Sequence, residues 1–180
     1  MFKKFLLVAS AGLMAIGTAA AAEKVKIGFV TTITTPAGVI GRDMVDAVNL
    51  AMEDIGGKMA GRDVELIIED DGFKPAIGKQ KTDKLVKQDK VQFVTGFIWS
   101  HVLLASQKSA LGAGKFLISS NAGPSQMAGK LCHKNFFSTS WQNDQTPMAM
   151  GEVLNLNNVG SLYVMAPNYA AGKNMVAGVT

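Results

Sequence analysis

Short apolar segments alternate with segments of helical periodicity along most of this 180-residue chain. The expected strands are Val25–Phe29, Val64–Ile68, Val91–Thr95, Phe116–Ser119, Phe136–Thr139 and Ser161–Ala166. The intervening helical segments begin near Met44, Pro75, Ser100 and Thr146 and after Gly172. This alternation predicts βαβ units and an α/β fold with a parallel sheet. Because the crossovers are right-handed, the strand-to-helix loops share one edge of the sheet, where such folds bind ligands.

Two successive loops at that edge are rich in small, hydrogen-bonding residues. Within Gln92–Ser125 a strand ends at Gly96, a helix opens at Ser100, and the next strand runs into Asn121, Ala122 and Gly123. A helix N-terminus offers free N–H donors and partial positive charge, which suits a carboxylate. Aromatic walls would come from Trp99 and Tyr169. These loops predict a site for a small anionic or zwitterionic molecule with a hydrophobic part.

Each of these residues also has an ordinary structural interpretation. Ser100 is a plausible helix N-cap with or without a ligand, and the residues from Asn121 to Gly123 are typical of a turn. Trp99 and Tyr169 are compatible with packing or with a surface loop. Asp70 and Asp71 follow a strand, and we expect them to cap a helix or face solvent rather than contact a substrate.

The first 22 residues resemble a secretory signal. A basic start, Phe2–Lys4, precedes the apolar segment Phe5–Gly17 and the small residues Thr18–Ala22, and this order predicts cleavage after Ala22. The apolar segment is shorter than the roughly 20 residues that span a membrane. No cysteine lies near the cleavage point to carry a lipid. We therefore expect a soluble periplasmic protein that is not a lipoprotein.

Composition and motif spacing argue against several other functions. The 18 basic residues only slightly outnumber the 14 acidic ones, and the lysines between residues 74 and 90 are interrupted by acids, so we expect no nucleic-acid partner. Cys132, His101 and His133 have no partners at metal-ligand spacing, so we expect neither metal nor cofactor. Phosphate-loop, dinucleotide and nucleophile-elbow motifs are absent from the sequence. Ser100 and His101 are adjacent, so their side chains should diverge, and we expect no enzyme activity.

In their order along the chain, several short motifs resemble the branched-chain amino-acid type of periplasmic solute-binding protein, the ligand-capturing subunit of an ATP-driven importer. The motifs are Val25–Phe29 with its Thr/Pro/Gly loop and Gly41, Ala47–Gly57, Gly61–Leu66 with the Asp70–Asp71 turn, Gly96–Ser100, Ile118–Gly123, and Asn168–Gly172. The Gly-Phe-Ile-Trp-Ser and Ser-Asn-Ala-Gly-Pro segments are more similar to members that bind aromatic carboxylates. Ile40 replaces an aromatic residue frequent in leucine-type members, and the cysteines of their disulfide are missing.

The resemblance implies the type I periplasmic-binding-protein fold, with two α/β lobes whose parallel sheets are flanked by helices. Residues 1–22 would be the signal, 23–140 the first lobe, and 141–180 the hinge and the start of a second lobe, so the chain is expected to be a fragment. The hinge would include Trp141, Gln142 and Asn143. Ser100 and the loop Asn121, Ala122 and Gly123 would hold the ligand carboxylate, and Tyr169 would contact the ligand from the second lobe.

The same resemblance implies partners and leaves alternatives open. The ligand would be a branched-chain or related amino acid or an aromatic acid. The protein partner would be an inner-membrane ABC permease, and the full-length protein would be a monomer. A secreted α/β enzyme, or a ligand-sensing domain of the same fold, remains the alternative if further functional residues lie beyond Thr180.

Overall fold

A six-stranded sheet forms the centre of the protein. The computed structural model describes residues 23–180, and the expected signal segment 1–22 lies outside the described residues. The strand order is β2-β3-β1-β4-β5-β6, parallel throughout except for the short β2. The strands are β1 (Val25–Thr31), β2 (Lys58–Met59), β3 (Arg62–Asp70), β4 (Phe93–Gly96), β5 (Phe116–Ser119) and β6 (Phe136–Ser138). The predicted α/β class and parallel sheet are thereby confirmed.

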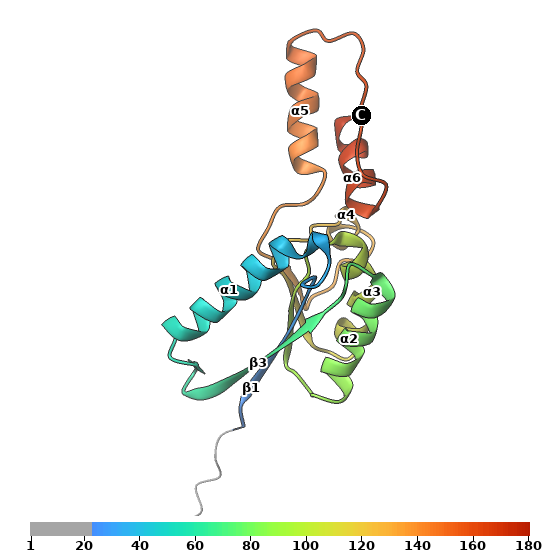
Figure 1. Ribbon diagram of the computed structural model, residues 1–180. Coiled ribbons are helices and arrows are strands. Elements are labelled where there is room, and N and C mark those ends of the chain that lie inside the picture. The colour runs from blue at the N-terminus through green and yellow to red at the C-terminus, as the bar shows by residue number, and fades with distance from the viewer. Residues whose placement is uncertain (1–22) are drawn as a thin grey trace, which may run out of the picture.

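The helices cover the sheet unevenly. They are the 3₁₀ turn η1 (Pro36–Gly38), α1 (Val39–Asp54), α2 (Pro75–Lys87), α3 (Ser100–Leu111), α4 (Ser125–Ala128), α5 (Gln145–Leu156) and α6 (Ala170–Val179). Figure 1 shows α2 and α3 side by side against one face of the sheet and α1 on the other side. Helices α5 and α6 form a separate pair that projects beyond the sheet (Figure 1).

The core lies between the sheet and the α2–α3 pair. Val30, Val94 and Leu117 extend inward from three parallel strands and are fully buried. Leu85 and Val86 on α2 meet them, as the helical spacing after Pro75 predicted. Burial of apolar side chains on both partners accounts for the stable docking of these two helices on the sheet.

Helix α1 is longer and more exposed than its sequence pattern predicted. It begins at Val39, five residues before Met44, and Gly41 is its only buried residue. A Cβ on Gly41 would lie 1.7 Å from the Thr32 carbonyl oxygen, so only glycine lets the helix approach the end of β1 this closely. The predicted end at Gly56 and Gly57 is confirmed, since both adopt left-handed φ angles of 61° and 65°.

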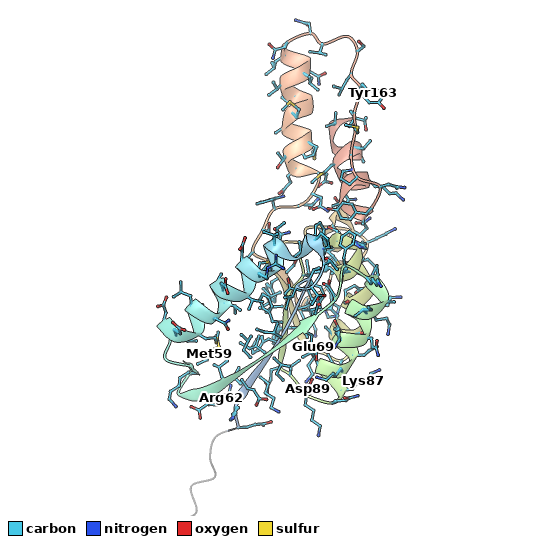
Figure 2. The ribbon with its side chains drawn as sticks, viewed as in Figure 1. Met59, Arg62, Glu69, Lys87, Asp89 and Tyr163 are labelled. Carbon is cyan, nitrogen blue, oxygen red and sulfur yellow. The ribbon has the colours of Figure 1, made fainter. Side chains whose placement is uncertain are left out.

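The predicted strand Ser161–Ala166 is wrong. The segment carries no strand assignment, and Tyr163 and Met165 are 89% and 87% exposed. Figure 2 shows Tyr163 on the segment that leads to α6, away from the sheet. A strand needs a neighbouring strand for its backbone hydrogen bonds, and residues 23–180 provide none beside this segment.

None of the helices within residues 23–180 combines the length and the apolar character needed to cross a bilayer.

Candidate functional site

The loop from β4 into α3 makes a tight turn at the carboxyl edge of the sheet. Gly96 has a φ of +98°, and a Cβ there would lie 2.3 Å from the Val30 carbonyl oxygen, so this position requires glycine. The turn delivers Trp99 and Ser100 to the start of α3. Trp99, with extended backbone, is the N-cap, and no side chain caps the helix. The N-cap interpretation of Ser100 is therefore wrong, because Ser100 is already the first helical residue.

The first turn of α3 presents unused hydrogen-bond donors. The N–H groups of Val102 and Leu103 both donate to the Trp99 carbonyl oxygen, at 3.0 Å. Those of Ser100 and His101 find no acceptor within residues 23–180. Ser100 is 2% exposed, so these donors lie in a largely desolvated position. An anionic group is the natural partner for such a helix N-terminus.

The loop after β5 is held in place by its own hydrogen bonds. The Asn121 side chain donates from Nδ2 to the Ile98 carbonyl oxygen at 3.0 Å. The Ala122 N–H donates to the Phe97 carbonyl oxygen at 2.9 Å, and the Ala122 carbonyl oxygen accepts from the Ser119 hydroxyl. Gly123 keeps its N–H free among the described residues. Asn121 and Ala122 thus brace the loop, and Gly123 is the residue with a donor to offer.

Four aromatic rings gather beside the start of α3. Trp99 and Tyr169 lie 6.1 Å apart between ring centroids, and His101 lies 5.4 Å from Tyr169. Phe73 contacts both Trp99, at 4.8 Å, and His101, at 5.0 Å, and the contacts are edge-to-face. We call Phe73, Trp99, His101 and Tyr169 the aromatic cluster. Sequence reasoning found Trp99 and Tyr169 but missed Phe73, although it follows the carboxyl end of β3 at the same edge.

Asp71 fixes the orientation of Trp99 through Thr32. The indole Nε1 donates to Thr32 Oγ1 at 2.9 Å, and the Thr32 hydroxyl donates to Asp71 Oδ1. Asp71 is fully buried and also accepts from the Phe73 N–H at 2.8 Å. Burial raises the pKa of the Asp71 carboxyl above its ordinary value.

Asp70 has a similar bracing role in the neighbouring loop. Its Oδ1 accepts from the Ile33 N–H at 2.9 Å and from the Gly72 N–H at 3.0 Å. The expectation that Asp70 and Asp71 cap a helix or face solvent is therefore wrong for Asp71, which is fully buried, whereas Asp70 stays partly exposed. The reason is the strand order, because β3 lies next to β1 and brings both carboxylates against the threonine-rich loop that follows β1.

Substitution of Asp71 by asparagine should change how stability depends on pH. Because the folded-state pKa is raised, the folded protein holds this proton more tightly than the unfolded chain does. The contribution of Asp71 to the wild-type free energy of unfolding therefore falls as the pH rises from 3.8 through the raised pKa. An asparagine amide does not titrate, so the stability of the Asp71→Asn variant relative to wild type should be higher at pH 7 than at pH 4. Urea unfolding of the full-length protein at both values measures this difference.

The matched control is Asp43→Asn, which removes an exposed carboxylate from α1. This control measures the effect of removing one negative charge without removing a buried group. A stability profile of the Asp71→Asn variant that runs parallel to that of wild type would contradict the burial argument.

The segment expected to be the hinge contacts the start of α3 and the loop after β5. It lies between β6 and α5, and Asn143 is 6% exposed there. The Asn143 N–H donates to the Gly123 carbonyl oxygen at 2.7 Å, and its side-chain Nδ2 donates to Ser100 Oγ at 2.9 Å. Trp141 is 59% exposed, and Gln142 donates from Nε2 to Asp144 at 2.6 Å. Asn143 therefore joins the start of α3 to the loop after β5.

Two hollows in the described part of the chain are not lined by Trp99 or Ser100. One, of about 330 Å³, lies beside Gly123, Cys132, Trp141 and Gln142. The other, of about 520 Å³, is an apolar groove along α5 and α6. Residues 23–180 contain no group of three or more potential metal ligands, and Cys132 is exposed and unpaired.

The arrangement offers several hydrogen-bond donors to an anionic group. The N–H groups of Ser100, His101 and Gly123 have no acceptor within residues 23–180, and Asn143 bonds to both Gly123 and Ser100. Aromatic side chains lie next to these donors. The Ser100 hydroxyl accepts a hydrogen bond from the Asn143 amide, and no hydrogen bond joins it to a basic side chain within residues 23–180.

Comparison with known proteins gives a consistent result. A family model described as periplasmic binding protein matches residues 24–180. A solute-binding protein of a Rhodopseudomonas palustris ABC transporter, solved with benzoate, is 27% identical to this chain, with a TM-score of 0.80. The match covers 87% of this chain and 44% of the R. palustris protein. A solute-binding protein from R. palustris BisB5, solved with 3,4-dihydroxybenzoic acid, is 24% identical, with a TM-score of 0.79, and the match covers 87% of this chain and 42% of that protein.

A more distant structure shares the fold. The branched-chain amino acid transporter substrate-binding protein LivJ from Streptococcus pneumoniae, solved with isoleucine, is 22% identical with a TM-score of 0.71, over 87% of this chain and 45% of its own. No curated protein matches the chain. The chain spans less than half the length of these solved structures.

Proposed function

Since the chain belongs to the periplasmic binding protein family, we propose that it forms the ligand-binding first lobe, and the start of the second, of a substrate-binding component of an ABC importer. Residues 23–140 would be the first lobe, and residues 141–180 the hinge crossing and the beginning of the second. The observation that carries the proposal is the set of free donors at the start of α3 beside the aromatic cluster. Closure of the second lobe would then sequester the ligand from water.

The ligand class that fits best is a small aromatic carboxylate. Ser100, His101 and Gly123 offer donors to the carboxylate, while Trp99 and Tyr169 offer edges and faces to a ring. The 27%-identical relative was solved with benzoate, which supports this choice. A branched-chain amino acid is the second candidate, supported by the family resemblance and by the shared fold of an isoleucine complex.

The remaining parts of the proposal follow from the transport role. The protein would capture and release its ligand unchanged, without enzyme activity or a cofactor. It would act in the periplasm after removal of residues 1–22, as a soluble monomer without a lipid anchor. Its protein partner would be the inner-membrane permease of the same importer.

A thermal-shift measurement on the full-length mature protein tests this function. Benzoate at ten times its dissociation constant should add about 1.4 kcal/mol to the free energy of unfolding and raise the melting temperature. Isoleucine is tested in parallel as the second candidate ligand. Benzamide, which lacks the negative charge of the benzoate carboxylate, is the control and should shift the melting temperature little. A shift with isoleucine alone would reassign the ligand class. Flat curves with both acids would contradict the proposed ligand classes.

A further inference from the structure

The side-chain amide of Asn143 donates two hydrogen bonds to other residues of the protein. From Nδ2 it donates to Ser100 Oγ at 2.9 Å and to Asn174 Oδ1 at 3.2 Å. Asn143 and Ser100 are 6% and 2% exposed, so water competes little for these bonds. Asn143 thus links three parts of the chain: the segment before α5, the start of α3, and α6.

The direction of these bonds follows from a backbone group. The orientation of an asparagine amide must be inferred from its partners. Here the Ser125 N–H lies 3.3 Å from one terminal atom of Asn174, and because an N–H can only donate, that atom is the oxygen. The atom of Asn143 that faces the same oxygen must then be its nitrogen. The Ser100 oxygen therefore receives a hydrogen from Asn143.

This direction determines what Ser100 can offer to a ligand. A hydroxyl has one hydrogen to donate, and its oxygen accepts through lone pairs. Since Asn143 occupies a lone pair of Ser100, the hydroxyl hydrogen points elsewhere, and it meets no acceptor among residues 23–180. The neighbouring N–H groups of Ser100 and His101 are also unsatisfied within those residues. All of these donors favour the same kind of partner, an anionic oxygen.

We propose that Asn143 is a positioning residue that holds the Ser100 hydroxyl as a hydrogen-bond donor to the ligand carboxylate. This inference rests on the proposed function and gives a residue of the expected hinge a role in recognition that it exerts through Ser100. The backbone N–H of Asn143 holds the segment independently of the side chain, through its 2.7 Å bond to the Gly123 carbonyl oxygen. Because Asn174 belongs to α6, the position of α6 also bears on the orientation of the serine hydroxyl.

A double-mutant cycle on the full-length mature protein tests the proposal, with benzoate as the probe in calorimetric titrations. Asn143→Ala should weaken benzoate binding about tenfold, the effect of disordering one hydrogen bond to a charged group. In a Ser100→Ala background the same change should weaken binding by less than about twofold, because the group through which Asn143 acts is already gone. Asn155→Ala, an exposed substitution on α5, is the matched control and should leave affinity unchanged.

A second variant separates orientation from folding. Asn143→Asp keeps the side-chain shape but offers an acceptor, which would capture the Ser100 hydrogen and place negative charge near the ligand. It should bind benzoate more weakly than Asn143→Ala does, while its ligand-free melting temperature shows that it folds.

The outcomes distinguish this inference from the proposed function. Equal losses from Asn143→Ala with and without Ser100 would mean a purely structural role and would overturn the inference alone. Unchanged binding by the Asn143→Asp variant would overturn it as well. If the wild-type protein binds neither benzoate nor isoleucine, the inference and the proposed ligand classes are both overturned.

Discussion

Gly123→Ala should destabilise the full-length protein by about 3 kcal/mol, because the backbone leaves no room for a methyl group. A Cβ on Gly123 would lie 1.9 Å from the Trp141 carbonyl oxygen and 3.0 Å from its carbon. Backbone atoms cannot rotate away as a flexible side chain would, so the segment around Trp141 must move. Such a movement would also stretch the 2.7 Å bond from the Asn143 N–H to the Gly123 carbonyl oxygen. Urea unfolding of the two proteins measures the loss.

The control for this prediction is Gly160→Ala. No atom lies within 4 Å of a Cβ built on Gly160, and its φ lies outside the left-handed region. Its effect should stay within about 0.5 kcal/mol, as for most surface substitutions. Equal stability of the Gly123→Ala variant and wild type would mean that the loop after β5 and the hinge segment do not pack as closely as described.

Ser100→Ala should weaken benzoate binding about 30-fold, corresponding to about 2 kcal/mol for one hydrogen bond to a charged group. Ser100 is 2% exposed at the first turn of α3, where water cannot easily replace the lost hydroxyl. The substitution also removes one of the two acceptors of the Asn143 amide. Calorimetric titration of the full-length mature protein gives the affinity, and a pH near neutrality keeps the ligand ionised.

A serine further along the same helix supplies the control. Ser106 is fully buried, and its hydroxyl has no hydrogen-bond partner among the described residues. Ser106→Ala should therefore leave benzoate affinity unchanged and cost little stability. If Ser100→Ala binds benzoate as tightly as wild type, Ser100 is only a buried helix residue and the proposed carboxylate contact is wrong.

The elements that the sequence predicted well are those whose pattern is local. The strands around Phe29 and Leu117 and the helix after Pro75 each carry an apolar periodicity that is readable within a short stretch of chain, and each forms as expected. The start of α3 at Ser100 was also predicted. These segments bury their own apolar residues against one common sheet, so local pattern and tertiary packing agree.

The errors share a different physical origin. The segment Ser161–Ala166 has the composition of a strand, but strand formation depends on a hydrogen-bonded neighbour. Asp70 and Asp71 looked like solvent-facing acids, yet β1 lies beside β3 and supplies hydroxyl and N–H donors to both. In each case the partner is distant in sequence, so no local pattern could have identified it.

The sequence by itself determined that this chain forms an α/β sheet with polar loops at one edge. The reason is that the periodicities of strands and helices, and the glycines that end them, can be recognised within short stretches of sequence. It also placed Trp99, Ser100 and Gly123 at that edge, whereas Tyr169, expected at the end of a sixth strand, contacts Trp99 from the start of α6. Only the tertiary structure decided which atoms remain available to a ligand. Ser100 and Asn143 are 43 residues apart in sequence, yet Asn143 Nδ2 lies 2.9 Å from Ser100 Oγ. Because Asn143 is the donor in this hydrogen bond, the serine hydroxyl hydrogen stays free to donate. Hydrogen-bond direction depends on such long-range neighbours, which strand order and helix docking bring together.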